Sequence, residues 1–170
     1  MRIGEILVEL RDQMYQYIKS IVPTWPEYVA RDWLYKGRGK NKNYNVNSEN
    51  IKDEILEMIA DAGLSPKTNP WKLVPNINFT IDMFDPLTKQ RLIGRAGGSS
   101  DLGLGIPKDK ERHATQAQLI QKQGVSKEPV ILLKTTQSYE LLEGWHRTIQ
   151  HFAKYPDGYV GPAYVAVSAK

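Results

Sequence analysis

The residues best suited to chemistry lie at positions 143–148, in the order Glu-Gly-Trp-His-Arg-Thr. Gly144 separates a stretch of strand character, residues 139–142, from a segment expected to be helical, residues 148–155. A helix that begins at such a glycine attracts anions through its backbone N–H groups and the positive end of its dipole. The guanidinium of Arg147 adds a fork of hydrogen-bond donors. The pattern therefore predicts a binding site for a phosphate group.

Two residues at this junction are candidates for catalysis, Glu143 and His146. Glu143 ends the strand, where its carboxylate could hold a metal ion or act as a general base. An equally simple interpretation is that Glu143 forms an ion pair with Arg147. His151 follows His146 by five residues, so the two lie on different faces of a helix, and we expect His151 to be partly exposed.

Strands are expected on both sides of this junction. The apolar run 129–133, the polar turn 134–138 and the stretch 139–142 predict a hairpin that leads into it. Residues 161–168 predict a last strand after the helix. Earlier in the chain, apolar residues alternate with a period near two from Leu73 to Phe84, which predicts a further strand.

The segment after Phe84 is expected to return to the sheet. Residues 85–89, Asp-Pro-Leu-Thr-Lys, predict a turn, and residues 90–93 predict a strand that pairs back as a hairpin. A helix is expected over roughly residues 113–123, ended by Gly124.

The first third of the chain is expected to be helical. Apolar residues between Ile3 and Ile21 recur at intervals of three and four, and Pro23 ends the pattern. Thr24 is a candidate N-cap for a second helix, and Asn47-Ser48 for a third. Turn formers at positions 65–70 mark a boundary. We therefore expect an α+β protein in two parts, which are a helical region over residues 1–66 and an α/β core over residues 67–170.

The composition is that of a soluble globular chain. A length of 170 residues suffices for a sizeable core, and a net charge of +4 permits an anionic partner without requiring one. The sequence has no cysteine, which excludes disulfides, thiolate nucleophiles and cysteine zinc sites. No apolar run approaches the ~20 residues that span a bilayer. Because the first residues also lack a signal-peptide pattern, we expect a cytoplasmic protein with no membrane partner.

Two further segments suggest contacts with anions. The glycine-rich residues 94–105 match neither the Walker pattern nor the dinucleotide fingerprint, so we interpret them as a loop, with a lid as the alternative. A basic stretch with aromatic neighbours can bind nucleic acid, although a solvated loop is the commoner outcome. Its basic residues are Arg31, Lys36, Arg38, Lys40 and Lys42.

Residues 113–154 resemble the ParB/sulfiredoxin superfamily. The shared pattern is a helix and a glycine, a strand that begins Pro-Ile/Val, and a strand that ends in acid-Gly-x-His-Arg and opens a helix. Here it reads Gln-Leu-Ile-Gln-Lys-Gln-Gly at 118–124, Glu-Pro-Val-Ile-Leu-Leu at 128–133, and Tyr-Glu-Leu-Leu-Glu-Gly-Trp-His-Arg at 139–147. The resemblance implies a mixed sheet with helices, preceded in this chain by the helical N-terminal region.

Members of this superfamily bind nucleoside triphosphates such as ATP with the Gly-x-His-Arg turn. The resemblance implies that Gly144 lets the backbone approach the phosphates and that His146 and Arg147 contact their oxygens. With a nucleotide bound there, we expect Mg²⁺ near Glu143. The other implied binding residues are Trp145, Thr148, His113, Thr115 and Gln116. Without cysteine the sulfinic-acid reduction of sulfiredoxin is impossible, and the arginine-rich box of the chromosome-partitioning proteins is missing.

Three functions stay open at this point. The first is an NTP-dependent phosphotransferase or NTPase. The second is a DNA- or RNA-binding protein, or a ParB-like nuclease, that uses the same anion site together with the basic residues of the N-terminal region. The third is a non-catalytic protein-interaction factor. Small members of this kind are common in bacteriophage genomes, which suggests a phage-encoded protein that acts in the host cytoplasm. The sequence does not predict an oligomeric state.

Overall fold

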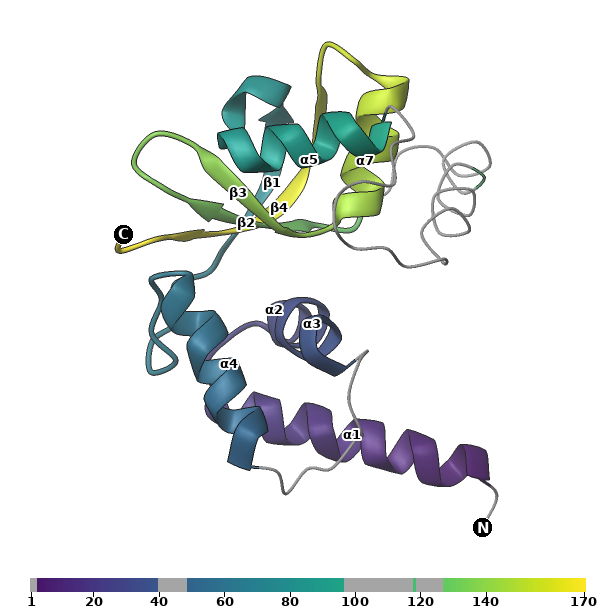
Figure 1. Cartoon of the computed structure of the whole chain (residues 1–170), viewed down its shortest axis with the longest axis vertical. Coiled ribbons are helices and arrows are strands. Elements are labelled where there is room, and N and C mark those ends of the chain that lie inside the picture. The colour runs from purple at the N-terminus through teal and green to yellow at the C-terminus, as the bar shows by residue number, and fades with distance from the viewer. Residues whose placement is uncertain (1–2, 40–48, 97–117, 119–126) are drawn as a thin grey trace. The chain divides into compact units, whose positions relative to one another are not determined.

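The computed structural model describes residues 3–39, 49–96, 118 and 127–170. The chain divides into a helical unit, Met1–Trp71 with Ala166–Lys170, and a sheet unit, Lys72–Val165. The first and the last residues of the chain therefore belong to the same unit, and the sheet unit is formed by the residues between them. Figure 1 colours both units by residue number.

The helices of the helical unit follow one another closely in the sequence (Figure 1). They are α1 (Ile3–Ile21), α2 (Glu27–Val29), the π-helix η1 (Ala30–Tyr35), α3 (Lys36–Gly39) and α4 (Glu49–Asp61). The predicted first helix is confirmed and ends two residues before Pro23. The second helix begins later than expected, because Pro26 rather than Thr24 takes the N-cap position.

The end of α4 follows the expected rule for a glycine after a helix. Gly63 has a left-handed φ of 67°. Its N–H donates to the Ala60 carbonyl at 2.8 Å, and the Leu64 N–H donates to the Ile59 carbonyl at 3.0 Å, which is the Schellman arrangement. A side chain at position 63 would fall within 2.6 Å of Ser168 Oγ, so this position needs glycine for space as well as for conformation.

The last residues of the chain are attached to this turn. Ser168 Oγ donates to the Ala62 carbonyl at 3.0 Å, and the Ala169 N–H donates to the Gly63 carbonyl at 3.1 Å. Three buried tryptophans pack together in the same unit. The rings of Trp25 and Trp33 are stacked with their centroids 6.1 Å apart, and Trp71 meets both edge-on. These aromatic contacts join the turn between α1 and α2, the π-helix η1 and the chain after α4.

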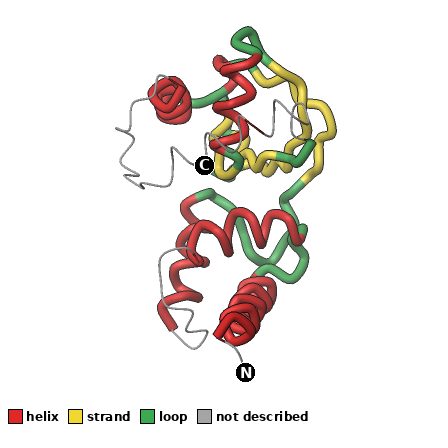
Figure 2. Tube along the Cα trace, turned by 90° about the vertical axis from the view of Figure 1, so that its right-hand side faces the viewer, coloured by secondary structure: helices red, strands yellow, loops and turns green. Residues whose placement is uncertain are grey.

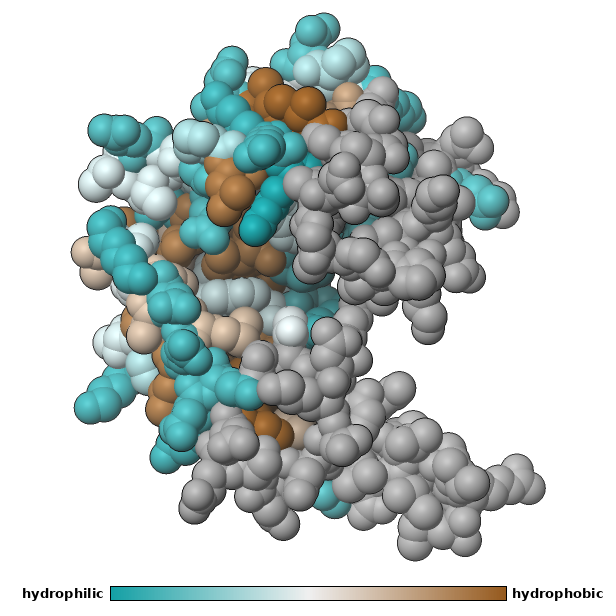
Figure 3. Space-filling view, viewed as in Figure 1, coloured by the Kyte–Doolittle hydropathy of each residue, from teal (hydrophilic) through white to brown (hydrophobic). Residues whose placement is uncertain are grey.

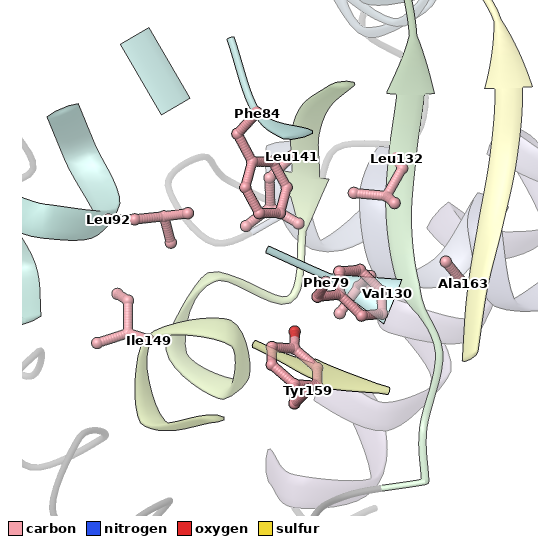
Figure 4. Close-up of a cluster of buried hydrophobic side chains, with 9 residues drawn as sticks. All are labelled: Phe79, Phe84, Leu92, Val130, Leu132, Leu141, Ile149, Tyr159 and Ala163. Carbon is pink, nitrogen blue, oxygen red and sulfur yellow. The ribbon is translucent and has the colours of Figure 1, made fainter. Parts of the chain in front are cut away.

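The sheet unit contains a four-stranded mixed sheet in the order β1-β4-β2-β3. Its strands are β1 (Lys72–Phe79), β2 (Val130–Lys134), β3 (Tyr139–Glu143) and β4 (Tyr159–Val167). The β1–β4 and β2–β3 pairs are antiparallel. In Figure 4, β2 and β4 run side by side in the same direction. The expected α+β class and the predicted hairpin of β2 and β3 are confirmed.

The segment after β1 differs from its prediction. A 3-10 turn, η2 (Ile81–Met83), follows β1, and residues expected to form a turn and a strand instead form the helix α5 (Pro86–Ala96). The Asp85 carboxylate accepts hydrogen bonds from the N–H groups of Leu87 and Thr88, at 3.0 and 3.1 Å. Asp85 therefore caps the helix and Pro86 opens it, a pairing typical of a helix start.

The core of the sheet unit lies between one face of the sheet and two helices, α5 and α7 (Trp145–Lys154). Figure 4 shows Leu92 of α5 directed toward Phe84 and Leu141, and Ile149 of α7 directed toward α5. Figure 2 shows the strands in yellow and these helices in red. The buried cluster consists of Phe79, Phe84, Leu92, Val130, Leu132, Leu141, Ile149, Tyr159 and Ala163. This core fixes the start of α7 against β2 and β3.

Large apolar side chains are also exposed in the described part of the chain, including Leu73, Ile93 and Val160. On the face shown in Figure 3, hydrophobic surface alternates with hydrophilic surface. Among the helices that the structure describes, none combines the length and the apolar character needed to span a bilayer.

Candidate phosphate site at the start of helix α7

The strand–glycine–helix junction predicted from the sequence is present in the structure. Gly144 is the N-cap of α7 and directly follows β3. Its φ of 99° and ψ of 20° lie in the left-handed region, which glycine adopts without a steric penalty. The Thr148 N–H donates to the Gly144 carbonyl at 2.9 Å, the first hydrogen bond of the helix. The backbone N–H groups of residues 145–147 therefore lie at the positive end of the helix dipole.

Position 144 also needs glycine because there is no space for a side chain. A Cβ atom at this position would lie 2.7 Å from Cγ1 of Val130, a buried residue at the start of β2. The turn is shaped further by a register shift in the β2–β3 pair, where Ile131 faces Glu143 and Leu132 faces Leu141. Such a bulge redirects the end of a strand. Together these features bring the backbone of the first turn of α7 close to β2.

Arg147 connects this turn to the chain before β2. Its Nη1 donates to Glu128 Oε2 at 2.9 Å, and its Nη2 donates to the Pro129 carbonyl at 3.2 Å. The Arg147 side chain is 11% exposed, whereas that of Glu128 is 72% exposed. Nη2 would also lie 3.4 Å from a Cβ at position 144, so the guanidinium lies against Gly144. The Arg147 guanidinium is therefore largely buried and held in place. Its Nη1 atom meets the exposed Glu128 carboxylate at the surface.

The neighbours of Arg147 differ in burial. Trp145 and His146 are half-buried, and Trp145 packs against the core while the Arg91 guanidinium lies 6.0 Å from its ring centroid. Thr148 is fully buried, and its hydroxyl donates to the Gly144 carbonyl at 2.9 Å. That hydroxyl secures the first turn of the helix. Glu143 is half-buried at the end of β3.

His151 lies in the core, which corrects the expectation of a partly exposed residue. Only 3% of it is exposed, and its ring meets the Tyr159 ring edge-on with centroids 4.4 Å apart. Neither ring nitrogen has a hydrogen-bond partner among the described residues. Burial, together with the smaller effects of the positive charges of Arg147 and Lys154, lowers the pKa of His151 to about 4. The imidazole is therefore neutral at pH 7.

Tyr159 is the second buried polar group beside α7. It is 7% exposed, and its ring stacks on Phe79 with centroids 4.7 Å apart. Burial raises the pKa of its hydroxyl to about 12, against the opposing effects of the Thr148 hydroxyl and the Arg147 charge. Its hydroxyl, like the His151 nitrogens, lacks a geometrically satisfactory partner among the described residues. The phenol therefore stays protonated at neutral pH.

Two of the five basic residues proposed to contact nucleic acid have described side chains, and both bind the same carboxylate. Arg31 Nε donates to Asp32 Oδ2 at 2.9 Å, and Lys36 Nζ donates to Asp32 Oδ1. Asp32 is buried in the π-helix η1, and its hydrogen bond raises the pKa of Arg31. Nothing is described of the side chain of Arg38, and Lys40 and Lys42 lie outside the described residues.

Several other predicted site residues lie outside the described part of the chain. They are His113, Thr115 and Gln116, with residues 97–105 of the glycine-rich segment. A metal site can be judged only for the described residues, where no three His, Asp or Glu side chains form a group that could hold an ion. Glu143 lies at the junction itself, and the Glu128 carboxylate lies beside Arg147. One carboxylate is compatible with Mg²⁺ that is carried mainly by the phosphates of a nucleotide.

Comparisons with models of known protein families, with curated proteins and with solved structures found no match to this chain.

The sequence interpretation missed Glu128 and Tyr159 as neighbours of the site. Glu128 lies 19 residues before its partner Arg147, and nothing in the local pattern indicates that the two meet. Pro129, which directly follows Glu128, was recognised only as the start of a strand. The position of β2 beside β3 could have provided a signal, because the residue before a strand that pairs with β3 must lie near the end of β3.

Proposed function

We propose that the sheet unit binds the phosphate groups of a nucleoside triphosphate at the N-terminus of α7. The observation that supports this most strongly is the position of the Arg147 guanidinium. It lies against Gly144 at the start of the helix and extends to the surface at Glu128. A fixed guanidinium and the positive end of a helix dipole act there on the same anion.

Each residue of the turn has its own role in binding the phosphate groups. Gly144 lets the backbone approach the phosphate oxygens, and Arg147 and His146 provide side-chain donors. Thr148 stabilises the turn through its bond to the Gly144 carbonyl. Mg²⁺ that arrives with the nucleotide would be held by the Glu143 carboxylate. The choice of a nucleoside triphosphate, rather than another phosphorylated ligand, rests on the resemblance of residues 113–154 to the ParB/sulfiredoxin superfamily.

A thermal-shift screen tests this proposal. ATP, CTP, GTP, UTP and pyrophosphate are added to the full chain, each with and without Mg²⁺. A ligand at about 100 times its dissociation constant stabilises the folded state by about 2.7 kcal/mol, which is a measurable shift of the melting temperature. We expect stabilisation by at least one triphosphate, and loss of that stabilisation in an Arg147→Ala variant. Equal stabilisation of the variant would rule out the site.

A further inference from the structure

We infer that the Glu128 carboxylate occupies, in the ligand-free protein, the position on Arg147 that a phosphate oxygen takes on binding. This inference rests on the proposed function and adds a specificity-determining residue to the same site. Glu128 Oε2 accepts from Arg147 Nη1 at 2.9 Å. A carboxylate and a phosphate oxygen make the same kind of charge-assisted hydrogen bond to a guanidinium. Binding is therefore an exchange of one anion for another.

The hydrogen bonds from Arg147 to Glu128 and to Pro129 differ in how easily they can be broken. The bond from Nη2 goes to the backbone carbonyl of Pro129, which is fixed by the start of β2. The bond from Nη1 goes to a side chain that is 72% exposed. The exposed carboxylate is solvated when it leaves, and the phosphate that replaces it keeps the largely buried guanidinium paired, so the exchange costs little. The Pro129 carbonyl then keeps the guanidinium in position while its outer donor changes partner.

The exchange of Glu128 for a ligand oxygen on Arg147 determines which anions bind with high affinity. A ligand must outcompete a carboxylate that is tethered next to the guanidinium, which disfavours a singly charged carboxylate ligand. A phosphate group has more negative charge and more acceptor oxygens, and it can also use the N–H groups at the start of α7. Glu128 therefore selects for phosphate groups over carboxylates and lowers the affinity for all anions.

The test measures binding of pyrophosphate and ATP by equilibrium dialysis. Glu128→Gln removes the competing charge and should bind both ligands about two- to fivefold more tightly, the factor that corresponds to a surface ion pair. Glu128→Asp keeps the charge but withdraws the carboxylate from Nη1 by one methylene, so it should bind more tightly than the unaltered protein by a smaller factor. Acetate should inhibit pyrophosphate binding more strongly in Glu128→Gln than in the unaltered protein.

Asp157→Asn is the matched control, because Asp157 is an exposed acid of the same unit that follows α7. Its affinity for pyrophosphate should equal that of the unaltered protein. If it binds as tightly as Glu128→Gln, the effect is one of net charge and the inference is wrong. The inference also fails if Glu128→Gln binds no more tightly than the unaltered protein, or if Glu128→Asp shows no gain. If no variant binds either ligand, the proposed function itself fails.

Discussion

Replacing Gly144 with alanine tests the geometry of the junction directly. The backbone at this position has φ 99°, a conformation that costs a non-glycine residue about 1–2 kcal/mol. The added Cβ would lie 2.7 Å from Val130 Cγ1, and relieving such a clash in a packed core costs about 1–3 kcal/mol. We therefore expect Gly144→Ala to destabilise the sheet unit by about 2–5 kcal/mol, a large part of the stability of an ordinary domain.

A double-mutant cycle separates the two causes. Val130→Ala removes the methyl group that the new Cβ would meet, at the cost of a cavity. If the clash contributes as stated, the double variant is less destabilised than the sum of the two single variants by about 1–3 kcal/mol. The backbone strain at Gly144 persists in the double variant, because it does not depend on Val130.

The assay must follow the sheet unit separately from the helical unit. The chain has four tryptophans. Trp145 belongs to α7, whereas Trp25, Trp33 and Trp71 belong to the helical unit. Fluorine NMR of protein labelled with 5-fluorotryptophan, recorded during urea unfolding, resolves the two transitions through these residues. A Gly144→Ala variant whose Trp145 transition stays within about 0.5 kcal/mol of the unaltered protein would refute this account of the junction.

Two further predictions concern elements near the site. Because the pKa of His151 is lowered from 6.5 to about 4, the unfolded chain binds its proton first, so stability falls between pH 6.5 and 4 by about 3 kcal/mol. His151→Phe should remove that part of the pH dependence of urea unfolding, and an unchanged dependence would contradict the burial of a neutral imidazole. Asp85→Ala should destabilise the sheet unit by about 1 kcal/mol through loss of the cap of α5, while the exposed Asp82→Ala should have little effect, with urea unfolding as the measurement. Equal losses in the two aspartate variants would contradict the capping role.

The elements that the sequence predicts well are those specified locally. The apolar run of β2, the turn after it and the glycine between β3 and α7 are all signalled within a few residues, and each is present in the structure. The helix α1 follows from its three-and-four spacing. For these segments local propensity and tertiary structure agree.

The prediction for α5 was wrong because one signal has two meanings. Asp85-Pro86 is typical of a turn, but an aspartate followed by proline is equally typical of an N-cap and the first residue of a helix. The structure has the second, with the Asp85 carboxylate bonded to the N–H groups of Leu87 and Thr88. The pattern Asp85-Pro86 is therefore compatible with both a turn and a helix start, and it does not by itself indicate a strand after it.

Contacts between residues far apart in the sequence follow from the pairing of elements rather than from local patterns. Arg147 meets Glu128 only because β2 pairs with β3, and His151 is buried only because β4 brings Tyr159 beside α7. The return of Ser168 and Ala169 to the end of α4 joins residues about a hundred positions apart. None of these pairs leaves a local pattern in the sequence, so only the structure identifies the neighbours of the site.

Arg147 is proposed to bind phosphate, and equilibrium dialysis with labelled ATP tests this role most directly. Arg147→Ala removes a charge-assisted hydrogen bond and should weaken binding about 10- to 100-fold. Arg31→Ala removes another ion-paired arginine, in the helical unit, and should leave binding unchanged. The fluorine signals of Trp145 and of the three tryptophans of the helical unit establish that each variant is folded. Weakening by Arg147→Ala alone is the predicted result, and ATP binding of equal strength in the unaltered protein and in folded Arg147→Ala would contradict the claim.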